Sequence, residues 1–167
     1  MKTFLVLFGV FLSMSVSASN QSFFEVGVGS QFGGLLGAKY AVAAGENRYF
    51  LGAGVSDFRG TSGREYGVSL GWERALSRKH SLGAFVLTKN YDVYTPTTFS
   101  QEAGLQPGTL ESVVSNYIAG SYTFYFNGSD SQSVVAGASI GKKYIHSDFN
   151  TGLKSEMTFG FQLGYQF

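Results

Sequence analysis

The end of the chain alternates strictly between two kinds of residue. Large apolar side chains stand at every second position, namely Met157, Phe159, Phe161, Leu163, Tyr165 and Phe167. The residues between them are small or polar, namely Thr158, Gly160, Gln162, Gly164 and Gln166. A period of two predicts a β-strand with one wholly apolar face. About 9–11 tilted strand residues suffice to cross a bilayer, so this segment is long enough to span one.

Similar segments recur along the chain between turn-forming residues. Glycine is abundant, with 23 residues, proline is scarce, with 2, and aromatic residues make up 16% of the sequence. Glycine and aromatic residues are poor helix formers, so this composition favours strands. We expect eight strands, over residues 23–30, 35–43, 49–58, 66–74, 82–94, 113–126, 134–146 and 156–167. The alternation does not assign the two faces of the fifth and sixth of these segments.

The face opposite to the apolar one carries mostly glycine, serine and glutamine. In the fourth segment, for example, Tyr66, Val68, Leu70 and Trp72 alternate with Gly67, Ser69, Gly71 and Glu73. A soluble sandwich would place more lysine, glutamate and threonine there. Small residues suit the crowded interior of a narrow barrel, and large apolar residues suit contact with lipid. The pattern predicts an all-β fold, an eight-stranded antiparallel up-and-down transmembrane β-barrel. A secreted soluble β-sandwich or lipocalin-like carrier is the alternative.

The N-terminal segment has the features of an export signal. Lys2 precedes an apolar run over residues 4–12, and small residues follow up to Ala18. The run is too short for a transmembrane helix, which needs about 20 apolar residues. We therefore expect a signal peptide over residues 1–18 and a barrel domain over residues 19–167.

The predicted connections differ in length in the manner of an outer-membrane barrel, which has short periplasmic turns and longer external loops. The predicted periplasmic turns are residues 44–48, 75–81 and 127–133. The predicted external connections are residues 31–34, 59–65, 95–112 and 147–155. The third of these, Thr95–Ser112, is the longest and contains both prolines. Loops on a rigid scaffold are common binding sites, so Thr95–Ser112 is the candidate contact for a surface ligand.

Charge and cysteine content exclude several classes of protein. Lysine and arginine number 12 against 11 aspartate and glutamate residues, which gives a formal net charge of +1. A nucleic-acid binder needs a basic surface, so this balance argues against one. Cysteine is absent, which excludes disulfides, thiolate metal sites and a cysteine nucleophile. No cluster of histidine and acidic residues has the spacing of metal ligands, so we expect neither a metal nor a cofactor.

The terminal strand resembles that of bacterial outer-membrane proteins, which end in an aromatic residue preceded by alternating apolar residues. The matching residues are Phe159, Phe161, Leu163, Tyr165 and Phe167. The whole chain after residue 18 looks like a small barrel of the OmpA/OmpX type. The resemblance implies a monomer in the bacterial outer membrane, in contact with lipid and lipopolysaccharide. It also implies that the barrel-assembly machinery reads the terminal strand as an assembly signal.

Four charged residues fall on the small-residue face, namely Glu25, Lys39, Glu73 and Lys143. An eight-stranded barrel is only wide enough for side chains to fill it, and buried ions need partners. We interpret these residues as a salt-bridge network that fills the lumen. A narrow porin-like channel is the alternative.

Residues of the kinds used by acyl hydrolases occur near the predicted outer rim. His146 and Ser147 are followed by Glu156, and lipid A deacylases of similar size use His, Ser and Glu. In that family the histidine and serine stand two positions apart on one strand, whereas here they are adjacent and on opposite faces. We therefore expect a structural or surface-interaction role without catalysis. A lipid A-modifying hydrolase that uses His146, Ser147 and Glu156 is the alternative.

Overall fold

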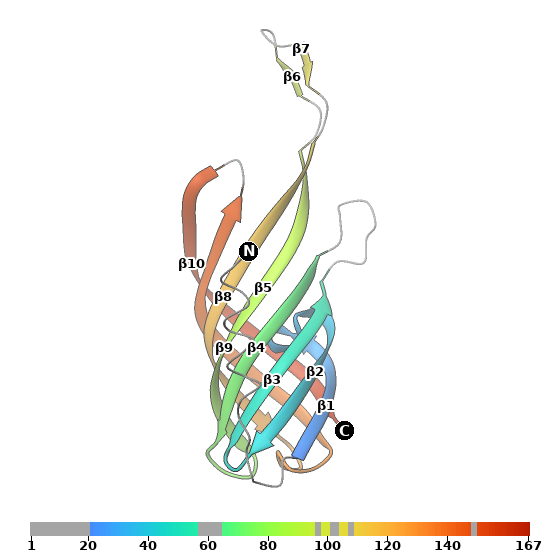
Figure 1. The fold of residues 1–167 in the computed structure, drawn as a ribbon, viewed down its shortest axis with the longest axis vertical. Coiled ribbons are helices and arrows are strands. Elements are labelled where there is room, and N and C mark those ends of the chain that lie inside the picture. Colours follow the sequence, from blue (N-terminus) through green and yellow to red (C-terminus); the bar gives the residue numbers. More distant parts are fainter. Residues whose placement is uncertain (1–20, 57–64, 96–97, 101–103, 107–108, 148–149) are drawn as a thin grey trace.

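The computed structural model describes residues 21–56, 65–95, 98–100, 104–106, 109–147 and 150–167. Eight strands of this part of the chain close into an antiparallel barrel (Figure 1). They are β1 (Gln21–Gly29), β2 (Gly34–Ala44), β3 (Asn47–Val55), β4 (Tyr66–Ala75), β5 (His80–Thr95), β8 (Thr109–Tyr125), β9 (Ser133–Ser147) and β10 (Asn150–Gln166). Each strand pairs with its neighbours in the chain, and β1 pairs with β10 to close the barrel. The predicted all-β, eight-stranded up-and-down barrel is confirmed. The predicted signal peptide, residues 1–18, lies outside the described residues.

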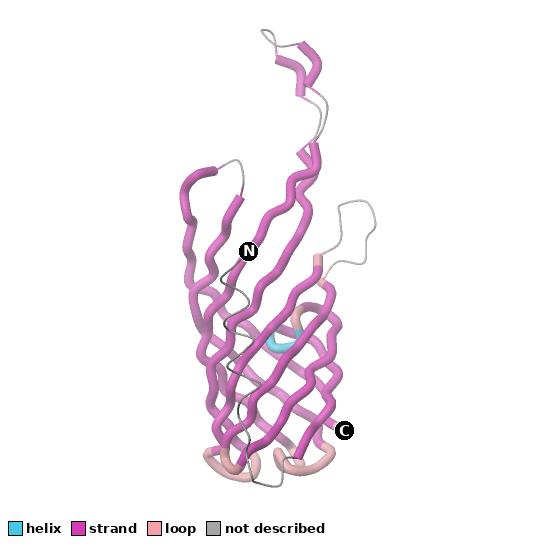
Figure 2. The backbone as a smooth tube through the Cα atoms, in the orientation of Figure 1, coloured by secondary structure: helices cyan, strands magenta, loops and turns pink. Residues whose placement is uncertain are grey.

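The two ends of the barrel differ, as Figures 1 and 2 show. Short turns over residues 45–46, 76–79 and 126–132 join strands at one end, here called the turn end. At the other, the hairpin end, β5–β8 and β9–β10 extend beyond the body of the barrel. Within the described ranges, no helix is both long and apolar enough to cross a membrane.

The segment predicted as the longest connection, 95–112, is largely strand. β5 continues to Thr95, which pairs with Thr109 at the start of β8. Beyond this pair, β6 (Thr98–Ser100) and β7 (Gly104–Gln106) form a separate two-stranded sheet. Pro96 and Pro107, the two prolines of this segment, lie outside the described residues. The predicted connection 147–155 is also largely strand, because β10 begins at Asn150.

Alternation along the strands sets which side chains point inward. In β4, Ser69 and Glu73 are buried, whereas Val68 and Leu70 are exposed. Cross-strand pairing carries this alternation around the barrel, because residues paired in register point to the same side. The pairing also assigns the two strands whose faces the sequence left open. In β5 and β8 the inward residues are Ser81, Phe85, Leu87, Ser115, Tyr117, Ala119, Ser121, Thr123 and Tyr125.

The connection between β1 and β2 turns into the barrel, so the predicted external connection 31–34 is wrong. A single turn of 3-10 helix, η1 (Ser30–Phe32), lies inside the ring of strands (Figure 2). Gln31 and Phe32 are both fully buried. Gly29 and Gly33 flank this turn with φ values of 111° and 80°, which side chains other than glycine rarely adopt. The two glycines allow the chain to fold inward and return within a few residues.

Candidate functional site

Four charged side chains are buried inside the barrel toward the turn end: Glu25, Lys39, Arg48 and Glu73, each at most 6% exposed. Lys39 Nζ lies 2.9 Å from Glu25 Oε2, and Arg48 Nη1 lies 3.3 Å from Glu25 Oε1. Two acids and two bases leave the cluster without net charge. Buried ions of this kind persist only when each has a partner, so the four form one electrostatic unit. We call these residues the charged layer.

Hydrogen bonds connect the charged layer to the opposite wall. Tyr125 Oη of β8 accepts from Arg48 Nη1 at 2.6 Å and donates to Glu73 Oε2 at 2.7 Å. Thr123 Oγ1 donates to Glu73 Oε1 at 2.9 Å and accepts from Gln162 Nε2 of β10 at 3.0 Å. Strands that are not neighbours in the sheet are thus tied across the lumen.

The turn between β8 and β9 covers the charged layer at the turn end. The backbone oxygen of Ser129 accepts from Arg48 Nη2 at 3.2 Å and from Gln166 Nε2 at 3.1 Å. Gln166 Nε2 also donates to the backbone oxygen of Ser131 at 2.6 Å, and Gln166 Oε1 accepts from Arg48 Nη2 at 2.7 Å. The turn that Asn127 and Gly128 introduce therefore caps the lumen as well as joining two strands.

The η1 turn forms a second obstruction closer to the hairpin end. Gln31 Nε2 donates to Ser121 Oγ of β8 at 3.2 Å, and Gln31 Oε1 accepts from Lys39 Nζ at 3.0 Å. Its backbone oxygen accepts from Ser69 Oγ of β4 at 2.5 Å. Ser30 Oγ lies 3.2 Å from Ser139 Oγ of β9. The turn is therefore fixed to several walls at once, and we call it the plug.

Glycines in β2 and β3 make room for the plug. A Cβ added at Gly37 would lie 1.9 Å from the backbone oxygen of Phe32, and one at Gly54 would lie 2.3 Å from the same atom. At Gly52 a Cβ would lie 2.2 Å from the backbone oxygen of Gln31. Real Cβ atoms do not approach so closely, so these small residues form the seat of the plug. The abundance of glycine on the inward face thus has a specific structural cause at these positions.

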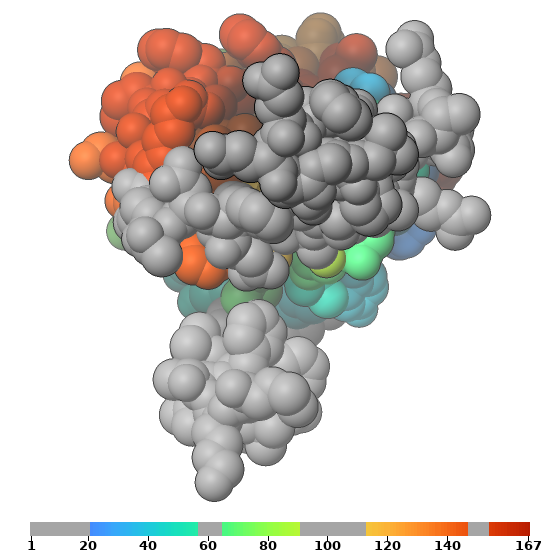
Figure 3. Space-filling view, turned by 90° about the horizontal axis from the view of Figure 1, so that it is seen from above, coloured from blue at the N-terminus to red at the C-terminus, as the bar shows by residue number. Residues whose placement is uncertain are grey.

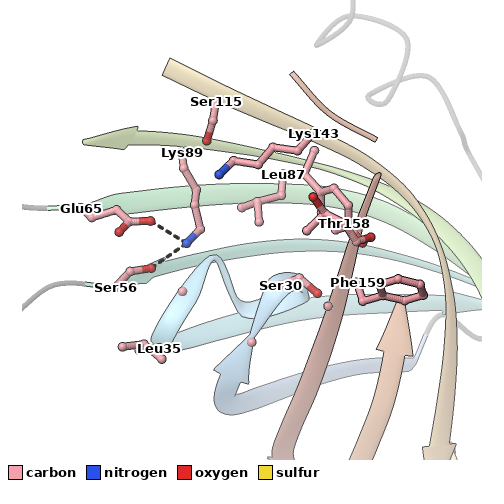
Figure 4. Close-up of a pocket in the computed structure, with 14 residues that line it drawn as sticks. Ser30, Leu35, Ser56, Glu65, Leu87, Lys89, Ser115, Lys143, Thr158 and Phe159 are labelled. Carbon is pink, nitrogen blue, oxygen red and sulfur yellow. Dashed lines mark hydrogen bonds and ion pairs between the residues drawn. The ribbon is translucent and has the colours of Figure 1, made fainter. Parts of the chain in front are cut away.

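A cavity of about 650 Å³ lies above the plug, at the hairpin end. Its lining includes Tyr117 and, as Figure 4 shows, Ser30, Leu87, Lys89 and Lys143. Lys89 Nζ donates to Glu65 Oε1 at 2.6 Å and to Ser56 Oγ at 2.8 Å. Lys143 Nζ lies 4.0 Å from Glu156 Oε1, at the limit of an ion pair. The volume lies within the range of about 300–1,000 Å³ that is typical of small-molecule sites.

The four charged residues predicted to form one network in the lumen lie in two separate places in the structure. Glu25, Lys39 and Glu73 lie in the charged layer, whereas Lys143 lines the cavity near Glu156. Arg48 takes part in the layer although the sequence placed it in a turn. Its inward position was detectable from its alternation with Phe50 and Gly52, because β3 begins at Asn47. Tyr125 and Thr123 were missed because the faces of their strand were unassigned.

The residues of the hydrolase alternative are not brought together by the strand register. His146 pairs with Val114, and Ser147 pairs with Val113, so the two residues are consecutive positions of β9. Glu156 pairs with Lys143, three positions along β9 from His146, or about 10 Å at the rise of a strand. Within the part of the chain that the structure describes, no three His, Cys, Asp or Glu side chains lie close enough to hold a metal ion.

The residues of the predicted assembly signal lie on the outer face of β10. Phe159, Phe161, Leu163, Tyr165 and Phe167 are all exposed. The ring centroids of Tyr165 and Phe167 are 5.0 Å apart, and those of Phe24 and Phe167 are 6.4 Å apart. An aromatic cluster therefore covers the outside of the seam between β1 and β10 at the turn end. In comparisons with known proteins, no family model, no curated protein and no solved structure matches this chain.

Proposed function

We propose that the chain is an exported protein of the bacterial outer membrane that serves as a sealed anchor and presents its β5–β8 hairpin at the cell surface. The observation that carries this proposal is the ring of exposed large apolar side chains around a closed barrel. Phe159 and Phe161 of β10 are 70% and 75% exposed, and Leu51, Leu70 and Val86 expose their side chains from β3, β4 and β5. Soluble proteins rarely expose contiguous apolar surface on this scale.

The outward residues also carry the two further features of a lipid-facing surface. Along β4 the outward residues from Tyr66 to Trp72 are uncharged, and a charge at the midplane would cost about 2–4 kcal/mol. Aromatic side chains gather at the turn end, including Phe24, Trp72, Tyr165 and Phe167. Tyrosine and tryptophan concentrate at membrane interfaces because their rings are amphipathic. The turn end would then face the periplasm and the hairpin end the exterior.

A sealed barrel suits an anchor better than a channel. The charged layer and the plug both fill the lumen with side chains that water does not reach, since Glu25, Gln31 and Lys39 are all 0% exposed. Contact with lipopolysaccharide, a host surface or another cell would then fall to the hairpin end. In this proposal the signal peptide is cleaved after Ala18, the barrel-assembly machinery reads the terminal strand, and the barrel is a monomer.

Shortening the β5–β8 hairpin tests the surface role. Residues 96–108 are replaced by Asp-Gly, which forms a two-residue hairpin turn between Thr95 and Thr109. We expect the protein extracted from outer membranes to retain heat-modifiable migration on gels, because the barrel ladder is unaffected. We also expect a changed phenotype in adhesion, serum survival or envelope stress. A shortened strain that matches its parent in all three assays would remove the surface role from the proposal.

A further inference from the structure

The wall of the barrel is incomplete between β1 and β10 at the hairpin end. The ladder that joins these strands runs from Glu25 and Gln166 to Gly29 and Gln162, where β1 stops and the plug begins. β9 accompanies β10 much further, to Lys154 and beyond. Among the described residues, the part of β10 that precedes Gln162, from Asn150 to Phe161, therefore pairs on one side only, with β9. Viewed from the hairpin end, atoms of β9 and β10 (orange to red) gather on one side of the molecule (Figure 3).

Two residues on either side of this gap indicate that the cavity reaches the outer surface through it. On one side, Phe159 and its inward neighbour Gly160 in β10 both border the cavity, although Phe159 is an outward residue in register with the exposed Ile140. On the other side, Leu35 has the inward parity of Gly37 and Lys39, yet it is 62% exposed and also lines the cavity.

The lining combines an apolar portion with a cationic one. Leu35, Leu87, Tyr117 and Phe159 provide apolar surface that continues outward to the lipid-facing band. Lys89 and Lys143 project into the same space (Figure 4), and Glu65 is the acidic residue of the lining, while Glu156 stands beside Lys143 outside the lining. Lys89 is held by Glu65 at 2.6 Å and by Ser56 at 2.8 Å, whereas Lys143 is 4.0 Å from its partner Glu156, so Lys143 is the ammonium group more readily offered to a ligand. Its side chain is 31% exposed.

We infer that this cavity binds one amphiphile with an anionic head group and a single alkyl chain, which enters sideways from the outer leaflet through the gap between β1 and β10. The head group pairs with Lys143, and the alkyl chain lies along Leu87 and Tyr117 and leaves past Phe159 and Leu35. This inference rests on the membrane location proposed above. The plug closes the cavity below, so the ligand does not pass to the turn end.

Native mass spectrometry with two adjacent lysines as a matched pair tests the head group. The mature protein, refolded in a neutral detergent, is titrated with dodecyl phosphate below its micelle concentration. We expect one bound molecule per chain, and about tenfold or greater weakening by Lys143→Gln, since charge-assisted hydrogen bonds are among the stronger ones. Lys142→Gln removes the same charge from the outward neighbouring position and should leave binding unchanged. Equal weakening by the two substitutions would overturn the inference.

A second pair tests the lateral opening. Leu35→Gln should weaken binding several-fold, because Leu35 lines the gap, whereas Leu36→Gln on the outward face should not. Dodecyl maltoside, which has the same alkyl chain without a charge, should compete poorly, and inorganic phosphate should not displace the ligand. Competition by either of them at the affinity of dodecyl phosphate would overturn the proposed ligand class. Heat-modifiable migration confirms that each variant is folded.

The outcome for the cavity is separable from that for the membrane location. A nitroxide label at residue 70 that contacts lipid, together with no binding of dodecyl phosphate, would refute this inference and leave the proposed function intact. A label at residue 70 that contacts water would refute both.

Discussion

Arg48 Nη1 donates a hydrogen bond of 2.6 Å to Tyr125 Oη across the lumen, between β3 and β8, which are not neighbours in the sheet. The same guanidinium contacts Glu25, Gln166 and the backbone of Ser129. Arg48 therefore links the charged layer, the opposite wall and the turn that covers them. Because networks of this kind are satisfied as a unit, the loss of one member leaves the others buried without partners.

Removal of Arg48 should destabilise the barrel strongly. Arg48→Met leaves Glu25 with only Lys39 as a partner, and breaking a buried ion pair typically costs about 3–5 kcal/mol. The measurement is urea unfolding of the refolded protein in micelles, followed by the fluorescence of the single tryptophan. Arg74→Met is the control, because the Arg74–Glu46 pair is 60% and 69% exposed and contributes at most about 1 kcal/mol. Similar losses for the two variants would show that the charged layer does not stabilise the fold.

The seat of the plug should not tolerate even a methyl group. Gly37→Ala would place a Cβ 1.9 Å from the backbone oxygen of Phe32, so the plug or β2 must move, at a cost of about 1–3 kcal/mol. Gly120→Ala is the matched control, because its Cβ, on the outward face of β8, would be 3.9 Å from the nearest atom, the backbone oxygen of Gly83. The same unfolding experiment compares the two. A Gly37→Ala variant as stable as the Gly120→Ala variant would contradict the description of the plug.

A charge on the outward apolar face of the strands should lower the free energy of unfolding, whereas the same charge in a turn should not. Leu70→Arg places a guanidinium on the outward face of β4 and should lower the free energy of unfolding in lipid bilayers by about 2–4 kcal/mol. Leu76→Arg makes the same change at a residue that is also exposed, 60% against 39%, but lies in the turn between β4 and β5. It should alter stability by about 0.5 kcal/mol or less. Equal effects of the two substitutions would argue that no bilayer surrounds the barrel.

The two layers of the lumen predict a barrel that does not conduct ions. Planar bilayers that contain the refolded protein should show no steady current steps, because the charged layer and the plug each fill the lumen. Phe32→Ala should remain silent as well, since it alters the plug but leaves Glu25, Lys39, Arg48 and Glu73 in place. Regular single-channel steps from the unmodified protein would contradict the seal. Steps from Phe32→Ala alone would show that the charged layer is no barrier.

The strands could be predicted from the sequence because a barrel imposes opposite environments on the two sides of every strand. The alternation from Met157 to Phe167 and the one from Tyr66 to Glu73 record those environments directly. In β5 and β8 the sequence does not alternate between apolar and polar residues. Apolar residues such as Phe85, Leu87 and Tyr117 fill the inside, while Val86 and Ile118 cover the outside. Only the register with neighbouring strands separates the two sides there.

The plug and the membership of the charged layer could not be predicted in the same way. Nothing in the residues Ser30, Gln31 and Phe32 distinguishes an inward turn from an external one, since the contacts that hold them come from β4, β8 and β9. The same is true of the separation of Lys143 from Glu25. Inward parity puts both side chains in the lumen, but their distance along the barrel axis depends on strand tilt and stagger.

The most direct test of a lipid-facing outer surface and a sealed interior is a nitroxide scan along β4. The chain has no native cysteine, so a cysteine introduced at each of the outward residues 66, 68, 70 and 72 of β4 in turn gives a unique label. In bilayers, the labels at residues 68 and 70 should collide readily with oxygen, which dissolves in lipid, and scarcely with a water-soluble nickel complex. At the inward, fully buried position 69, the nearly isosteric Ser69→Cys is left unlabelled and should resist a water-soluble thiol reagent in the folded barrel. Frequent collisions of the nickel complex with the labels at residues 68 and 70 would contradict the account.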